Sequence, residues 1–528
     1  MGTQRERNTL VEGAVILTAA AVFVKILSAV YRVPFQNIVG DIGFYIYQQV
    51  YPVYGIALSL ATYGFPVVVS KMIAEAAGDE RRRQEVIRSS YYVTGIFGLV
   101  LWAAVFFGSK WIADAMGDAS LQPLLQVASL SFLLLPFLTV WRGIFQGENN
   151  MIPTALSQTV EQAVRVGGIL FFSYWLIGQG ASLYAAGAGA FAGSLAGGLA
   201  GTGILLYFIR SRRVPVKPSQ IKRSGQRREL LGLFIKGAII CLPGMGLILF
   251  QLVDSFNLYE GLLQAGRGAW EAKGEKGVYD RGQPLLQLGT TAAVSLALAV
   301  VPLVTMASQR KQYEELDRHI QLSLKASFAF GLAAAAGLIN IMDAVNTMLF
   351  ENSSGSLVLS IFCTAVLFSS LAAVLSGVLQ GLGYDGIPAA AFLAGIALKY
   401  IGNIVLVPAY GTAGAALSTT AALAGVVLML SAALWKKRKS SLFIQKSAGK
   451  AVLAAAAMTL SLYAWRWVAD YTGWLQLDSR LAMTVLALSS TAIGAFVFIY
   501  TMIKVKLFTD EELQYLPFGD KLRRGKFL

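Results

Sequence analysis

Apolar runs of 18 or more residues recur along almost the whole chain, and each is long enough to cross a lipid bilayer as a helix. Inside the hydrocarbon no water satisfies the backbone, so such runs must be helical. Hydrophobic residues make up 56% of the 528 residues and charged residues only 14%, which no soluble globular protein of this length resembles. The sequence therefore predicts an all-α, polytopic membrane protein.

The hydropathy pattern predicts fourteen transmembrane helices. They are expected at residues 11–32, 45–70, 89–107, 123–145, 152–177, 183–209, 231–253, 283–308, 320–342, 357–380, 387–407, 411–434, 449–469 and 481–503. With this count, most of the 44 Lys and Arg residues fall on one side of the membrane. The positive-inside rule assigns that side, and with it both termini, to the cytoplasm.

An internal repeat divides the chain into two similar halves. The motif GIFQG at 143–147 returns as GVLQG at 377–381, and the same offset takes Arg165 to Lys399. An even number of helices in each half gives both copies the same orientation, and such parallel repeats place the substrate between them. We expect an N-lobe of six helices at 1–209, a basic cytoplasmic linker at 210–230, a C-lobe of six helices at 231–435, two further helices at 449–503 and a cytoplasmic tail at 504–528.

Motifs of soluble catalytic machinery are missing from the sequence. There is no GxxxxGK[ST] phosphate loop, no HExxH, no GxSxG and no Cys/His cluster, so we expect no enzyme, metal site or cofactor. Cys241 and Cys363 both fall inside apolar segments, which does not favour a disulfide. The single histidine, His319, lies in a charged stretch that we interpret as a solvated loop.

Basic residues inside predicted spans are the strongest functional signal, because each costs about 2.5–3.5 kcal/mol at the centre of a membrane helix. Lys25 and Arg32 lie two turns apart on one helix face, and such a cationic ladder suits a phosphate or pyrophosphate. Lys399 has no acidic residue within two helical turns, so it must face a partner helix, a cavity or a ligand.

Two further charged positions leave alternatives open. Arg165 follows Glu161 by four residues on the same helix face, which fits a structural ion pair and a functional role equally well. Asp254 ends the predicted helix 231–253 and either pairs with a basic residue or binds a cation.

An Asp-Arg pair stands just before the predicted helix 283–308. In the first half of the repeat, Ile46 and Tyr47 occupy the positions of Asp280 and Arg281, so the charged pair belongs to the second half alone. Helix N-termini favour anions. We therefore interpret this pair as part of a cavity wall that receives a phosphate.

The segment 24–75, VKILSAVYRVPFQNIVGDIGFYIYQQVYPVYGIALSLATYGFPVVVSKMIAE, resembles the first two helices of SpoVB/YabM-type polysaccharide biosynthesis proteins of Gram-positive bacteria. These belong to the multidrug/oligosaccharidyl-lipid/polysaccharide exporter superfamily, alongside MurJ-type lipid II flippases. The resemblance extends over the whole chain. It implies a V-shaped pair of six-helix lobes in the bacterial plasma membrane, which move a lipid-linked oligosaccharide from the inner to the outer leaflet by alternating access.

The resemblance also implies roles for particular residues. Lys25 and Arg32 match the two basic positions on helix 1 of MurJ-type proteins, and Asp280, Arg281 and Pro284 match their Asp-Arg and Pro at helix 8. In that family such arginines are thought to hold the pyrophosphate of the substrate.

Some relatives bind sodium through acidic and amide side chains, and Asp254 and Asn403 match that pattern here. Val407 stands where a second carboxylate is expected, which argues against sodium coupling. Proton coupling or use of the membrane potential stays open.

Three functions follow as alternatives. The first is a flippase for an oligosaccharide linked to undecaprenyl pyrophosphate, lipid II or a related precursor, acting as a monomer beside the cell-wall synthesis machinery. The second is an antiporter of cationic drugs, which the basic rather than acidic residues in the spans disfavour. The third is a membrane glycosyltransferase with its site in the outer loop 254–282, which is short for such an enzyme.

Overall fold

The computed structural model describes residues 27–28, 30–211, 232, 235–298, 301–438, 445–473 and 479–514. Every regular element in these ranges is a helix and none is a strand, which confirms the predicted all-helical fold class. In the same ranges, nine helices are long and apolar enough to cross a membrane, or ten if the bent pair Ile235–Cys241 and Pro243–Gln264 forms one span. The chain is a multi-pass membrane protein, and the total of fourteen spans stays a prediction.

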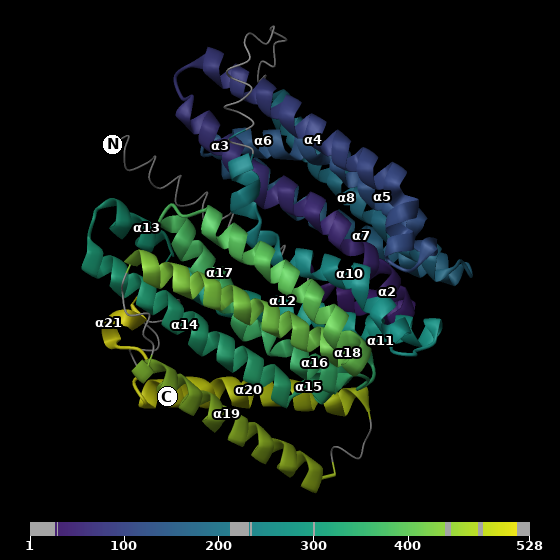
Figure 1. Ribbon diagram of the computed structural model, residues 1–528, viewed down its shortest axis with the longest axis vertical. Coiled ribbons are helices and arrows are strands. Elements are labelled where there is room, and N and C mark those ends of the chain that lie inside the picture. The colour runs from purple at the N-terminus through teal and green to yellow at the C-terminus, as the bar shows by residue number, and fades with distance from the viewer. Residues whose placement is uncertain are drawn as a thin grey trace. The chain divides into compact units, whose positions relative to one another are not determined.

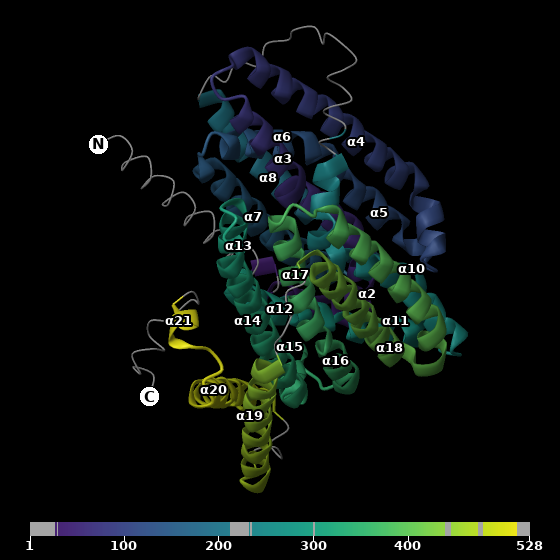
Figure 2. The same cartoon turned by 60° about the vertical axis from the view of Figure 1, so that its left-hand side comes forward.

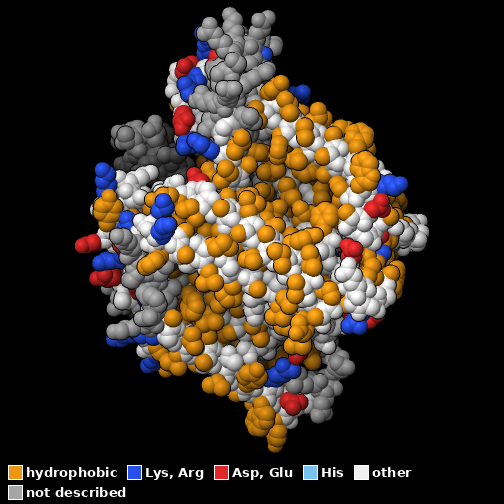
Figure 3. Space-filling model, viewed as in Figure 1, with side chains coloured by type: hydrophobic (Ala, Val, Ile, Leu, Met, Phe, Trp, Pro, Cys, Tyr) orange, Lys and Arg blue, Asp and Glu red, His pale blue; other side chains and the backbone are white. Residues whose placement is uncertain are grey.

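The surface of the described residues is strongly apolar. The side chains of Phe107, Trp111 and Leu428 are 70%, 75% and 70% exposed. Figure 3 shows hydrophobic side chains over broad areas of the face in view, with most of the charged side chains near its margins. Lipid tails match such a surface, whereas exposure of it to water would favour aggregation.

The contacts of the chain divide it into two units, Met1–Glu260 and Gly261–Leu528. The division falls within helix α10 (Gly246–Gln264), beyond the basic segment 210–230 at which the sequence predicts the lobes to divide. The lobe boundaries expected from the sequence therefore stay a prediction.

The first unit is built of helices (Figure 1). They are α2 (Arg32–Ser59), α3 (Phe65–Glu75), α4 (Glu80–Ala115), α5 (Gln122–Ser129), α6 (Leu135–Gly147), α7 (Met151–Gly178), α8 (Leu183–Ser211) and most of α10. Small residues let α7 and α8 pack closely: a Cβ on Gly168 would lie 2.7 Å from the Cα of Gly193. Membrane helices often associate in this way, because van der Waals contact replaces the hydrophobic effect between them.

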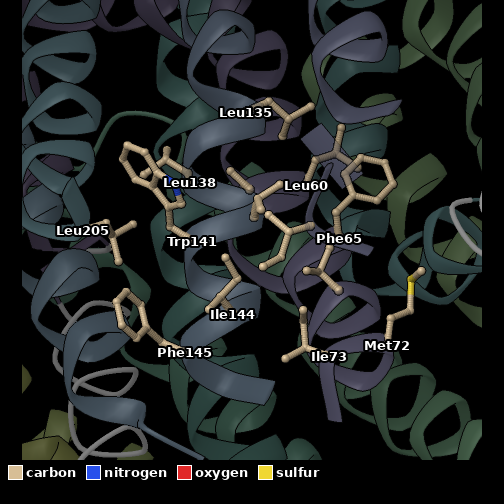
Figure 4. Close-up of a cluster of buried hydrophobic side chains, with 14 of the residues drawn as sticks. Leu60, Phe65, Met72, Ile73, Leu135, Leu138, Trp141, Ile144, Phe145 and Leu205 are labelled. Carbon is tan, nitrogen blue, oxygen red and sulfur yellow. The ribbon is translucent and has the colours of Figure 1, made fainter. Parts of the chain in front are cut away.

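A hydrophobic core in the first unit joins α3, α6 and the end of α8 (Figure 4). Phe65 and Ile73 of α3 pack with Leu135 and Ile144 of α6, and Leu205 of α8 closes the cluster. All five side chains are at most 3% exposed. This core holds α6 in place, and α6 carries one of the buried charges described below.

The second unit is also built of helices. Its helices are α11 (Ala269–Asp280), α12 (Gly282–Leu298), α13 (Val301–Gln309), α14 (Tyr313–Asn340), α15 (Met342–Phe350), α16 (Ser356–Cys363), α17 (Ala365–Gly381), α18 (Gly386–Arg438), α19 (Gln445–Tyr471), α20 (Arg480–Lys504) and α21 (Asp510–Leu513). α19 and α20 pack against each other, and α19 also contacts α14 (Figure 2).

The repeated GxxQG motif ends equivalent helices in the two units. α6 ends at Gly147 and α17 at Gly381, the second glycine of each copy. A Cβ on Gly147 would lie 2.7 Å from the Cβ of Ile73, and one on Gly381 would lie 2.7 Å from Oγ1 of Thr305. The motif therefore marks the places where α6 approaches α3 and α17 approaches α13.

The prediction that His319 lies in a solvated loop is wrong. His319 belongs to α14 and is 2% exposed, with Nε2 3.5 Å from a carboxylate oxygen of Glu315. The charged stretch around it forms the first turns of α14, where Glu314 and Glu315 suit the positive end of the helix. One face of these turns packs inward. A charged stretch of sequence can therefore contain a buried residue such as His319.

Substitution of Gly143 by leucine should destabilise the first unit. A Cβ at this position would lie 2.5 Å from the Cβ of Val69 and 3.2 Å from the carbonyl oxygen of Pro66, and overpacking of this kind costs about 1–3 kcal/mol. We expect Gly143→Leu to lower the temperature at which the detergent-solubilised protein aggregates. Gly167→Leu is the control, because nothing lies within 4 Å of a Cβ there. Equal thermal stability of the two variants would contradict the packing role.

Candidate functional site

Ten Lys, Arg, Asp and Glu side chains are buried in the part of the chain that the structure describes. They are Arg32, Asp118, Arg142, Glu161, Arg165 and Asp254 in the first unit, and Lys276, Asp280, Arg281 and Lys399 in the second. Burial of an ionised group costs several kcal/mol unless charges and hydrogen bonds inside the protein compensate for it. The partners of these groups therefore decide which of them serve structure and which are available to a ligand.

Tyrosine rings surround Arg32 at the start of α2. Its guanidinium carbon lies 4.6 Å from the ring centre of Tyr51 and 5.9 Å from that of Tyr31. The hydroxyls of Tyr31 and Tyr47 are 3.0 Å apart. Arg32 is 2% exposed, so the sequence expectation of a position near the outer end of a span understated its burial.

A break at Gly40 brings these residues together. In a straight helix, residues 31 and 47 would be about 24 Å apart along the axis at 1.5 Å per residue. Gly40 has φ +70° and ψ −178°, a backbone conformation that glycine adopts without steric cost. The chain therefore folds back at Gly40. This bend brings Tyr31 to Tyr47 and Arg32 to Tyr51.

Arg165 of α7 joins this aromatic cluster. It is 0% exposed, and its guanidinium carbon lies 5.1 Å from the ring centre of Tyr31 and 5.5 Å from that of Tyr54. The ion pair with Glu161 that the helix spacing allowed is not formed. None of the three guanidinium nitrogens has a hydrogen-bond partner among the described residues.

Glu161 pairs instead with Arg142 of α6, and both are buried. Arg142 also donates to Oγ of Ser157 at 3.0 Å, to Oγ1 of Thr62 at 3.2 Å and to the carbonyl oxygen of Ala61 at 3.2 Å. The pair therefore ties α6 and α7 to the π-helical turn Leu60–Gly64 that follows α2. The Arg142–Glu161 ion pair therefore has a structural role.

Arg142 is not among the functional residues predicted from the sequence, because it lies near the end of the predicted span 123–145. One signal pointed to it. A glutamate in the middle of the predicted span 152–177 needs a cation on a neighbouring helix, and Arg142 lies in the preceding span. Lys25, the other predicted member of the cationic ladder, lies outside the described residues.

The sequence predicts that Asp280 and Arg281 lie in an outer loop, but the structure places them in the second unit at the junction of two helices. α11 runs through Asp280, and only Arg281 separates it from α12. Both side chains are buried, at 3% and 0% exposure. Asp280 accepts a hydrogen bond from Nζ of Lys276, one turn earlier, at 2.9 Å.

Arg281 turns toward the end of α15. Its Nη1 donates to the side-chain oxygen of Asn352 at 2.8 Å and of Asn346 at 3.2 Å, and its guanidinium carbon lies 5.2 Å from the ring centre of Phe350. Amide oxygens carry no net charge, so the positive charge of Arg281 is hydrogen-bonded there without being neutralised by these partners.

Lys399 faces the second half of its own helix, α18. Its Nζ donates to Oγ1 of Thr419 at 2.7 Å and to the carbonyl oxygen of Ala415 at 3.0 Å. α18 is broken at Gly411, where φ is +57°. Lys399 thus ties the two parts of α18 together across this break, and a contact with a ligand stays a prediction.

Asp254 and Asn403 are 2% and 1% exposed, on α10 and α18. They belong to different units, and neither is without a partner in the protein. Val407, one turn after Asn403, is fully buried. In the described part of the chain, no three His, Cys, Asp or Glu side chains gather in a way that would hold a metal ion.

Comparison with known proteins decides the family. Residues 10–308 match the family model described as "Polysaccharide biosynthesis protein". The chain belongs to this family. It is 43% identical to the membrane protein YabM of Bacillus subtilis, over 98% of this chain and 97% of that protein. It is also 23% identical to the lipid II flippase MurJ of the same organism, over 93% and 95% of the two chains.

Solved structures agree on the fold of this family member. A lipid II flippase MurJ in an inward closed conformation aligns with a TM-score of 0.70 and 18% identity, over 93% of this chain and 99% of that chain. An inward-facing MATE multidrug transporter aligns with a TM-score of 0.63 and 17% identity, over 81% and 98%. The resemblance expected from the sequence is confirmed, and these relatives are flippases and transporters.

Removal of one partner of the Arg142–Glu161 pair should destabilise the protein strongly. Glu161→Ala leaves Arg142 buried without its counter-charge, which costs about 3–5 kcal/mol. We expect a marked loss of folded protein, measured by size-exclusion chromatography after extraction from the membrane. The double variant Arg142→Met, Glu161→Leu removes both charges and should recover part of the loss. A double variant that is no more stable than Glu161→Ala would contradict this account.

Proposed function

We propose that the protein is a flippase that moves an oligosaccharide linked to undecaprenyl pyrophosphate, lipid II or a related precursor, from the inner to the outer leaflet by alternating access. One observation carries the proposal. In a chain similar over nearly its full length to a lipid II flippase, each unit buries an arginine beside aromatic rings. These are Arg32 in the first unit and Arg281 in the second.

Arginine suits a pyrophosphate, because its planar guanidinium presents paired donors and keeps its charge at any physiological pH. The asparagine oxygens next to Arg281 and the tyrosine rings next to Arg32 hold each side chain in place. Asp280 supports the same segment through Lys276. The charge of the pyrophosphate would then be compensated during passage through the low-dielectric interior.

An antiporter of cationic drugs is the second candidate, since the fold is shared with MATE transporters. The buried charges argue against it. Among the described residues, six buried Lys and Arg face four buried Asp and Glu, and both Glu161 and Asp280 already pair with cations. A cationic drug would therefore be repelled by the excess of buried positive side chains.

A glycosyltransferase is the third candidate. Much of the outer loop in which its site was expected is helical. Residues Ala269–Asp280 form helix α11. Arg267 lies 3.0 Å from a carboxylate oxygen of Glu275 and 3.9 Å from one of Glu271, while Asp280 pairs with Lys276. Carboxylates held in ion pairs on one helix do not favour this chemistry.

Replacement of either arginine should block delivery of the substrate. We expect Arg32→Ala and Arg281→Ala each to lower the outer-leaflet lipid II of a strain depleted of its own flippase by at least tenfold relative to the wild-type chain, because a charge-assisted contact to the pyrophosphate is lost. The measurement is labelling of outer-leaflet lipid II at matched membrane abundance. Arg267→Ala, which removes an exposed cation, is the control. Wild-type labelling in both site variants would reject the proposal.

A further inference from the structure

Arg165 of α7 is buried without a hydrogen-bond acceptor. Its side chain is 0% exposed, and Nε, Nη1 and Nη2 all lack a partner among the described residues. Its guanidinium lies over the ring faces of Tyr31 and Tyr54, which attract a cation but leave its N–H donors unused. Buried polar atoms nearly always find a partner. We therefore expect Arg165 to gain an acceptor in a second arrangement of the protein.

Glu161 is the acceptor nearest to Arg165 along the helix, one turn before it. Side chains four residues apart share a helix face, with their Cβ atoms about 5–6 Å apart. Glu161 is 2% exposed and pairs with Arg142 of the neighbouring helix α6. One buried carboxylate therefore lies within reach of two buried guanidinium groups, and a rotation of its side chain is enough to change its partner.

Arg142 does not depend on Glu161 alone. It also donates to three uncharged oxygens, those of Ser157, Thr62 and Ala61. If the carboxylate turned away, Arg142 would keep these acceptors, and Arg165 would gain a charge-assisted hydrogen bond. Each arrangement thus gives the carboxylate one arginine, so the free energies of the two arrangements are close enough for both to be populated.

The contacts of Arg142 fall on a break in helix geometry. Ala61 and Thr62 belong to the π-helical turn Leu60–Gly64 between α2 and α3. Single π-helical turns inside α-helices occur often at functional positions, and they are among the few features at which helices bend sharply. The Arg142–Glu161 pair therefore fixes a point at which this long helix can bend.

The same long helix supplies one of the rings that cover Arg165. Tyr54 lies on α2 ahead of the π-helical turn, and its ring centre is 5.5 Å from the guanidinium carbon. A cavity with about 20 Å³ of free space, enough for about one water, adjoins Tyr54, Ala61 and Glu161. The carboxylate therefore has room to rotate beside the turn.

The second half of the repeat lacks this group of charges. The offset that relates the two GxxQG motifs takes both members of the ion pair to uncharged residues, Ser376 and Gly395. Lys399, the counterpart of Arg165, donates to acceptors of its own helix. The repeated fold therefore does not require a carboxylate with two arginines, and this group belongs to the first half alone.

We propose that Glu161 exchanges its partner between Arg142 and Arg165, and that this exchange releases and resets the π-helical turn Leu60–Gly64. The three charges form a conformational switch within the first unit, whichever substrate the protein carries. In the arrangement that the structure shows, Arg142 binds the carboxylate and the turn together. In the second arrangement Arg165 binds the carboxylate, and Arg142 contacts the turn without the ion pair that orients its guanidinium.

A double-mutant cycle tests whether Glu161 can turn to Arg165. Arg142→Met, Arg165→Met and the double variant are compared by the temperature at which the detergent-solubilised full-length protein aggregates. Methionine is apolar and flexible, so it fills the space of the arginine without an unpaired donor. We expect Arg165→Met to match or exceed the wild-type temperature. The double variant should fall well below Arg142→Met, because Glu161 then has neither cation.

Two results of the cycle would overturn the exchange. One is an equal effect of Arg165→Met in the wild-type and Arg142→Met backgrounds, which would mean that Glu161 never turns to Arg165. The other is failure of Arg165→Met to fold, which would make Arg165 a structural residue in the arrangement that the structure shows.

Cys241 reports the position of the π-helical turn. A Cβ on Gly64, the last residue of the turn, would lie 2.7 Å from Sγ of Cys241, and this cysteine is 8% exposed. A movement of the turn would therefore change access to the thiol. Cys363→Ala leaves Cys241 as the only thiol of the chain. In this background the rate of alkylation by N-ethylmaleimide is measured on the detergent-solubilised protein.

The exchange predicts opposite effects of the two substitutions on this rate. Arg142→Met frees Glu161 for Arg165 and should raise the rate severalfold, whereas Arg165→Met confines Glu161 to Arg142 and should lower it severalfold. A purely structural ion pair predicts no change in Arg165→Met, and that result would overturn the switch. Arg210→Gln, which removes an exposed cation of α8, is the control and should keep the wild-type rate. Neither measurement uses a substrate, so the proposed flippase function is tested separately.

Discussion

An ionised side chain inside a membrane needs a counter-charge or hydrogen bonds from the protein, and the two units of this structure meet that need differently. In the second unit Asp280 pairs with Lys276, and Lys399 is hydrogen-bonded to its own helix. In the first unit Glu161 pairs with Arg142, and Arg165 contacts the faces of aromatic rings. Because unpaired burial is costly, this difference in partners is the main guide to function in the molecule.

Much of the architecture is readable from the sequence because it rests on local patterns. Long apolar runs predict membrane helices, and the two copies of GxxQG mark equivalent helix ends at Gly147 and Gly381. Both patterns act over a few turns of one helix. The glycines also report close packing without a structure, since a side chain at either position would overlap a neighbouring helix. The presence of buried cations at Arg165 and Lys399 was likewise predictable from their places in apolar runs, whereas the burial of Arg32 was not.

The partners of those charges were not predictable, because they come from other helices or from breaks in the same helix. The spacing of Glu161 and Arg165 favoured a pair within one helix, yet Glu161 binds Arg142 on the neighbouring helix α6. The Asp-Arg pair at 280–281 suggested a loop, but α11 fills that stretch. The environment of His319 also depends on packing between helices. Its charged neighbours in the sequence predicted exposure, but one face of α14 packs inward and buries it.

Glycine breaks determine where two of the buried cations find their contacts. Gly40 and Gly411 both have positive φ, and each interrupts a long helix. Across the first break Tyr31, whose ring lies next to Arg32, meets Tyr47. Across the second break Lys399 meets Ala415. In an unbroken helix, partners 16 residues apart would be separated by about 24 Å. Each cation contact and its bend therefore form together, so any motion that straightens one of these helices must also release the charge that the bend encloses.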